Sequence, residues 1–159
     1  MTKLLFLTIM SSICLLGCSM TNKLHGHNDK VVYYEKGVST NLVIDNPNNL
    51  FDLVRELVKG TDDSFRLIVT KSTIDNAKQK RSVEITFANE INVSMNNGKS
   101  LSFSKILISL KNDDEPNDNS SVVFYCGKKV YFTPPYINSK GAKIADEIMR
   151  LCLNAIQNK

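Results

Sequence analysis

The strongest constraint on the fold is a run of apolar side chains at every second position between residues 83 and 107. The residues that keep this period are Val83, Ile85, Phe87, Ile91, Val93 and Met95 before the turn Asn96-Asn97-Gly98, and Leu101, Phe103 and Leu107 after it. A period of two places all of these side chains on one face of a β-strand. The pattern predicts an antiparallel hairpin with one buried face.

The register of this hairpin follows from which loop pairs apolar residues with apolar residues. A two-residue Asn97-Gly98 turn would oppose apolar to polar side chains, whereas a three-residue loop with a left-handed Gly98 matches them. The pairs expected for the longer loop are Val93 with Leu101, Ile91 with Phe103 and Phe87 with Leu107. The same register sets Asn89 opposite Lys105, a polar break at which either the strand bends or bulges or the pair lines a cleft. We expect the bend or bulge.

Two helices are predicted around this hairpin. The first has Asp45 or Asn46 as its cap, Pro47 in its first turn and Gly60 as its stop. Its apolar stripe, at helical spacing, is Leu50, Leu53, Val54, Leu57 and Val58. The second starts near Ser139, with a buried stripe of Ile144, Ile148, Leu151, Cys152 and Ala155.

Further strands complete the prediction. We expect strands at 31–34 and 65–69, a short one at 42–44, and a pair formed by 122–125 and 130–133 around a tight turn at Gly127-Lys128. Apolar residues on both faces of 106–110 indicate a central strand, and 75–80 is expected as a polar link. The fold class predicted is α+β, with residues 31–159 as one domain. Its antiparallel meander sheet of about five to seven strands packs against two amphipathic helices, an order that resembles helix-grip folds.

The N-terminal segment has the features of an export signal. Lys3 precedes an apolar stretch from Leu4 to Leu16, about 13 residues long and too short to span a ~30 Å hydrocarbon layer. The stretch ends in Leu15-Leu16-Gly17-Cys18, which resembles the lipobox of bacterial lipoproteins. Residues 1–17 are therefore expected to be a signal peptide that the mature protein lacks.

The resemblance to bacterial lipoproteins has consequences for location. It implies a diacylglyceryl thioether on Cys18, cleavage between Gly17 and Cys18, and a palmitate-type acyl chain on the new amino terminus. Residues 18–30 would then be the lipidated cysteine and a flexible tether. In this family Ser19, which is not an aspartate, favours the outer membrane of a Gram-negative cell, with the domain in the periplasm or at the surface.

The cysteines of the exported domain leave two alternatives. Cys126 and Cys152 either form a disulfide bond in an oxidising envelope or are two separate buried apolar side chains. Charge is less informative, because the net charge of +4 is spread along the chain with acidic and basic residues interleaved. That distribution predicts no nucleic-acid surface.

No catalytic constellation is recognisable in the sequence. Both histidines, His25 and His27, lie in the tether, which excludes His-dependent nucleophile pairs and His-ligated zinc from residues 31–159. The acidic stretch 112–119 can be interpreted as a calcium site or as a solvated loop. It lacks the glycine of an EF-hand loop, and Phe124 stands in place of the closing glutamate, so we expect the solvated loop. No catalytic residue, metal or cofactor is predicted.

Two functions remain. We expect a non-enzymatic, lipid-anchored envelope protein that binds another envelope protein as an accessory subunit, assembly factor or inhibitor. The alternative is a carrier of a lipid or another apolar small molecule, in a cavity between the sheet and the C-terminal helix that Phe103, Leu107 and Ile148 would line. The stiff segment Thr133-Pro134-Pro135-Tyr136 could serve as a partner surface, but we expect the prolines only to stop the last strand and direct the helix.

Overall fold

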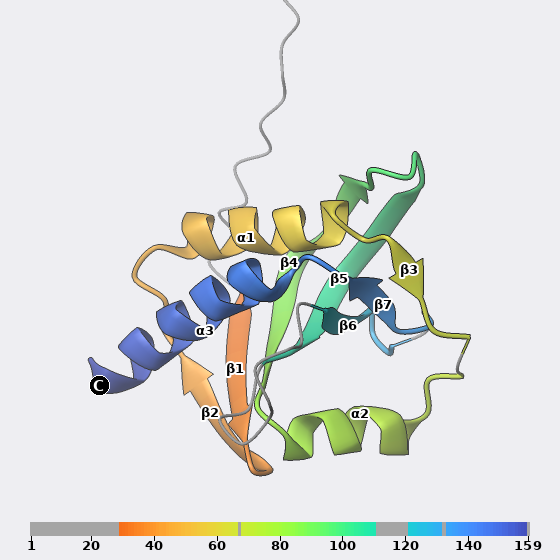
Figure 1. Ribbon diagram of the computed structural model, residues 1–159. Helices are drawn as coiled ribbons and strands as arrows, with labels where there is room; N and C mark the ends of the chain where they lie inside the picture. Colours follow the sequence, from red (N-terminus) through yellow and green to blue (C-terminus); the bar gives the residue numbers. More distant parts are fainter. Residues whose placement is uncertain (1–28, 67, 111–120, 132, 159) are drawn as a thin grey trace, which may run out of the picture.

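The computed structural model describes residues 29–158 except 67, 111–120 and 132, and it contains one antiparallel sheet and three helices (Figure 1). The elements in chain order are β1 (Lys30–Glu35), β2 (Val38–Leu42), α1 (Pro47–Lys59), β3 (Asp63–Ser64), α2 (Lys71–Gln79), β4 (Ser82–Ser94), β5 (Ser100–Ser109), β6 (Val122–Gly127), β7 (Tyr136–Asn138) and α3 (Ala142–Gln157). The seven strands lie in the order β2-β1-β4-β5-β6-β7-β3. The predicted α+β fold class is confirmed.

The helices lie on both faces of the sheet. Helices α1 and α3 lie side by side over one face, where they contact each other (Figure 1). Their apolar stripes and the sheet form the main core, in which Leu50, Ile85 and Ile148 are completely buried. Helix α2 covers the other face with Ile74 and Ala77, over a smaller core. Both faces of the central strands are therefore removed from water, which stabilises the sheet through apolar burial.

The turn of the β4–β5 hairpin is the one predicted. Gly98 has a φ of 80°, Met95 donates its N–H to the carbonyl of Lys99 at 2.8 Å, and Val93 and Ile91 pair with Leu101 and Phe103. The predicted pairing of Phe87 with Leu107 is wrong, because the register shifts between Thr86 and Ile91.

The register shift is the irregularity that the polar pair Asn89 and Lys105 indicated. Beyond it Lys105 pairs with Thr86 and Ile106 pairs with Ile85. Phe103 and Ile106 therefore both face the main core, although they are three residues apart. The consequence is that Leu107 faces α2, on the opposite side of the sheet from Phe103.

Helix α1, strand β1 and the central strand agree with the sequence. Asn46 caps α1 by accepting the N–H of Asn49 at 3.3 Å, Pro47 is in the first turn and Gly60 is the C-cap. Strand β5 is fourth of seven, and its residues Ile106 to Ile108 are completely buried.

The strand expected at 42–44 lies earlier, at β2. It forms a hairpin with β1 through Lys36 and Gly37, both at positive φ, as a two-residue turn of this type requires.

The segment between α1 and β4 differs from the prediction. The strand expected at 65–69 is absent from its described residues, and only Asp63 and Ser64 pair, with Ile137 and Tyr136 of β7. The polar link expected at 75–80 is instead mostly part of α2. A capping box in which Thr70 and Thr73 bond reciprocally starts this helix. Because only Ile74 and Ala77 are buried, the apolar signal was too weak to indicate a helix.

The end of the sheet also differs. Strand β6 pairs with β7 and not with 130–133, where the described residues make one isolated bridge, Gly127 with Tyr131. Thr133 instead binds the backbone of Cys126 through its hydroxyl, with bonds of 2.9 and 3.3 Å. Pro134 and Pro135 have no N–H to donate, so strand pairing resumes at Tyr136. The prolines thus lead into β7, and α3 begins only at Ala142.

Candidate functional site

The three residues expected to line a ligand cavity do not share one. Phe103 and Ile148 are completely buried in the main core beneath α1 and α3. Leu107 is equally buried but belongs to the smaller core beneath α2. The sheet itself separates them, because the register shift turned Leu107 to the other face. These side chains fill cores rather than line a space for a ligand.

The two domain cysteines are free thiols in the structure, and the disulfide alternative is not formed in it. Cys126 on β6 and Cys152 on α3 are both completely buried in the main core. Burial raises the pKa of both thiols, that of Cys152 to about 12. They therefore act as small apolar side chains, which is the second of the two alternatives.

Several features singled out in the sequence lie outside the described residues. These are the predicted signal peptide with Gly17 and Cys18, the two histidines of the predicted tether, and the acidic stretch 112–119. Among the residues that the structure describes, no helix is long and apolar enough to cross a membrane.

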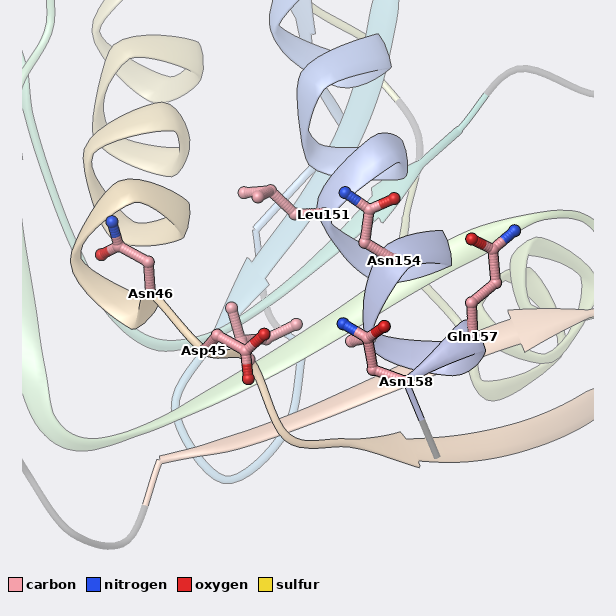
Figure 2. Close-up of a pocket in the computed structure, with 8 residues that line it drawn as sticks. Asp45, Asn46, Leu151, Asn154, Gln157 and Asn158 are labelled. Carbon is pink, nitrogen blue, oxygen red and sulfur yellow. The ribbon is translucent and has the colours of Figure 1, made fainter.

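A pocket of about 360 Å³ opens where the first residues of α1 lie near the end of α3 (Figure 2). One wall is the connection from β2 to α1, with Ile44, Asp45 and Asn46. The other wall is formed by the last two turns of α3, with Leu151, Asn154, Ala155, Gln157 and Asn158. We call this the α1–α3 pocket. It exists because α1 and α3 are antiparallel neighbours on one face of the sheet.

The walls of the α1–α3 pocket combine two kinds of chemistry. Ile44, Leu151 and Ala155 pack against the main core and give it an apolar floor. The side-chain amides of Asn154 and Asn158 lie across the opening from the carboxylate of Asp45 (Figure 2). An amide offers both donors and acceptors. The pocket thus suits a ligand with an apolar group and nearby neutral hydrogen-bonding groups.

Two exposed apolar residues are sequence neighbours of the residues that line this pocket. Val43, directly before Ile44, is 78% exposed, and Leu153, between Leu151 and Asn154, is 36% exposed. The sequence pattern did not indicate this site, because its residues come from a connection and a helix end, and Leu151 and Ala155 were expected to be part of a buried stripe.

A second polar site lies beneath α2. The carboxylate of Glu84 on β4 forms ion pairs with Lys78 of α2 and with Lys105 of β5, the latter at 3.4 Å. The ammonium of Lys78 lies 4.7 Å from the ring centre of Tyr34, and that of Lys105 lies 5.4 Å from the ring centre of Tyr131. We call these five residues the Glu84 cluster. Residue Glu84 is only 7% exposed.

The electrostatics of the Glu84 cluster are self-contained. Burial alone would raise the pKa of Glu84, but the hydrogen bond and charge of Lys78 and the charge of Lys105 outweigh it, so this pKa is lowered. The pKa of Lys78 is raised, because its bonds to Glu84 and Tyr34 outweigh burial. Burial and the adjacent carboxylate raise the pKa of Tyr131, whose hydroxyl lies beside Glu84 without a bond of normal geometry.

The role of the Glu84 cluster follows from these contacts. Both lysines already have the carboxylate as a counter-charge, and one of them comes from the helix that covers the site. The cluster therefore fastens α2 to the sheet. No group of three or more His, Cys, Asp or Glu side chains suited to a metal is present among the described residues.

Comparison with known proteins identifies no relative. No protein-family model matches the chain, and no curated protein or solved structure is significantly similar to it. The proposals below therefore depend on the residues themselves.

Proposed function

We propose that the mature chain is a lipid-anchored envelope protein without enzymatic activity, and that it binds a segment of another envelope protein at the α1–α3 pocket. The observation that carries this proposal is the pocket itself, with an apolar floor and an amide rim. The lipobox-like Leu15-Leu16-Gly17-Cys18 supports the anchored location.

The proposed ligand is an extended peptide segment with one apolar anchor side chain. The anchor would occupy the floor formed by Ile44, Leu151 and Ala155, while its main-chain N–H and C=O groups meet the amides of Asn154 and Asn158. Main-chain groups and amides match each other as donors and acceptors. Apolar anchors in pockets contribute most of the binding energy in many interfaces, with surrounding contacts that exclude water.

The carrier function has less support. Its predicted lining residues fill two separate cores, and the α1–α3 pocket has a largely polar rim that would leave an acyl chain facing amides and a carboxylate. Burying polar groups against an apolar ligand without hydrogen bonds costs free energy. A peptide satisfies these groups, so we favour protein binding.

Site-specific crosslinking in intact envelopes tests the proposal. A photoreactive amino acid at Val43 of the full-length chain should give a discrete crosslinked protein, because Val43 is exposed and directly precedes Ile44, which lines the pocket. The same group at Asn76, exposed on α2 at the other face of the sheet, is the matched control. Replacing Ala155, a partly exposed residue that lines the pocket, with Glu should abolish the product at Val43 and leave the amount of protein unchanged. Equal products at both positions, or none at Val43, would reject the pocket as the binding site.

A further inference from the structure

Three of the large apolar side chains exposed on the described surface lie on two loops near the β3 end of the sheet. Phe65 is 44% exposed and Ile68 is 88% exposed, both between β3 and α2. Val130, between β6 and β7, is 70% exposed. We call these three residues the loop patch. Isolated exposed apolar residues are common, but a group of them indicates a contact surface.

The two loops that carry the patch are neighbours. Val69 and Tyr131, which directly follow Ile68 and Val130, pack against the same small core beneath α2. Phe65 donates its N–H to the carbonyl of Pro135 at 2.9 Å, which holds the first loop to the segment that leads into β7. Figure 1 shows the β3–α2 connection at the side of the sheet that ends in β3 and β7. The loop patch therefore belongs to one side of the domain.

Three exposed basic residues are sequence neighbours of the loop patch. Arg66 lies between Phe65 and Ile68 in sequence, and Lys128 and Lys129 precede Val130; all three are exposed. Lys128 pairs with Glu90 at 2.8 Å, with both side chains about half exposed, so water screens that pair strongly. Apolar tips with basic flanks match the chemistry of an anionic lipid surface, whose headgroups attract cations while its acyl region accepts apolar groups.

We propose that the loop patch contacts the surface of an anionic lipid bilayer and orients the domain on the membrane that carries its anchor. The inference rests on the lipid anchor of the proposed function but not on the α1–α3 pocket. Eleven residue steps separate Cys18 from Asp29, which limits the reach of the connecting chain to about 40 Å. The domain thus stays close to the bilayer at a high effective concentration. A weak surface contact suffices under that condition.

The absence of tryptophan from the sequence allows a direct test. Ile68→Trp and Val38→Trp each introduce a single tryptophan into the full-length chain. Val38 is 68% exposed on β2, at the opposite edge of the sheet, and is the matched control. Each acylated protein is reconstituted into vesicles of phosphatidylcholine with about one third phosphatidylglycerol, with or without lipids brominated on the acyl chains. Mass spectrometry first establishes acylation of Cys18.

If the loop patch contacts the bilayer, brominated lipid should quench the fluorescence of the tryptophan at position 68 at least twofold more than that of the tryptophan at position 38. Adding Val130→Glu to Ile68→Trp should remove that difference, whereas adding Val43→Glu, near the other edge, should preserve it. Equal quenching at both positions in acylated protein would overturn the inference. It would also be overturned if the tryptophan at position 68 became shielded from solvent only after an envelope protein was added, because the patch would then bind protein and not lipid. Missing acylation would instead refute the anchor of the proposed function.

Discussion

Replacing Ile148 with Ala distinguishes a filled core from a ligand cavity. Ile148 is completely buried in the main core between α3 and the sheet. The change removes three carbon atoms, which at about 0.8 kcal/mol per buried methylene corresponds to about 2.4 kcal/mol of lost transfer free energy. The unfilled space left behind adds to this loss, so we expect about 3–4 kcal/mol of lost unfolding free energy.

That loss is large relative to the whole stability of a small domain, which is about 5–15 kcal/mol. For a domain of this size it corresponds to a melting temperature lower by about 12–15 °C. Urea unfolding followed by circular dichroism measures the free energy, and a thermal scan measures the temperature. Leu153→Ala is the control on the same helix, because Leu153 is 36% exposed and its truncation should cost less than about 1 kcal/mol.

The reasoning fails if Ile148→Ala costs no more than Leu153→Ala. Such a result would mean that the side chain faces an open space, as a carrier requires. A second result would refute the reasoning equally: added fatty acid raises the melting temperature of the wild type but not that of Ile148→Ala. That result would place a ligand where the structure has packed side chains.

Three further predictions follow from the Glu84 cluster, the β4–β5 turn and the two thiols. Glu84→Gln should lower the unfolding free energy by about 2–3 kcal/mol at pH 7. The reason is that Lys78 and Lys105, whose side chains are each 77% buried, lose their counter-charge. Since the folded pKa of Glu84 lies below its ordinary value of 4.5, this contribution is present above that value and is lost as the pH falls through the folded pKa. Urea unfolding at pH 7 and pH 3 should thus show the gap between wild type and variant shrinking; a constant gap contradicts the ion pairs. Gly98→Ala should cost about 1–2 kcal/mol through its positive φ alone, since no atom lies within 4 Å of the added methyl group, and Gly98→Asn should cost less. Equal melting temperatures for Gly98→Ala and wild type would exclude the left-handed turn. Cys126 and Cys152 should resist a thiol reagent at pH 8 until denaturant is added and then both react, whereas a disulfide-bonded pair would stay unreactive.

Those parts of the fold with a strong local pattern were predictable from the sequence. The cap, proline and apolar stripe fixed α1, and the matching of apolar pairs around Gly98 identified the turn and the first register of β4 and β5. Helix α2 escaped prediction because only two of its side chains are buried, and β7 because three residues are too short to show alternation. Tertiary contacts determine both elements.

The candidate sites were less predictable than the fold. The register shift moved Leu107 to the other face of the sheet, and no local signal specifies how many residues such a shift involves. The α1–α3 pocket combines residues about one hundred positions apart, from a connection and a helix end. The Glu84 cluster likewise depends on α2, which the sequence did not indicate. Sites of this kind are defined by packing and not by spacing.

The pairing of β3 with β7 has a consequence for the order in which the chain acquires its structure. Asp63 and Ser64 find their partners at Ile137 and Tyr136, more than seventy residues later. A chain that is exported as proposed above, with its amino end first, therefore leaves β3 unpaired until nearly all of the chain has been translocated. During that interval the segment that leads into α2 lacks its strand partner. It would then be accessible to an envelope chaperone or protease.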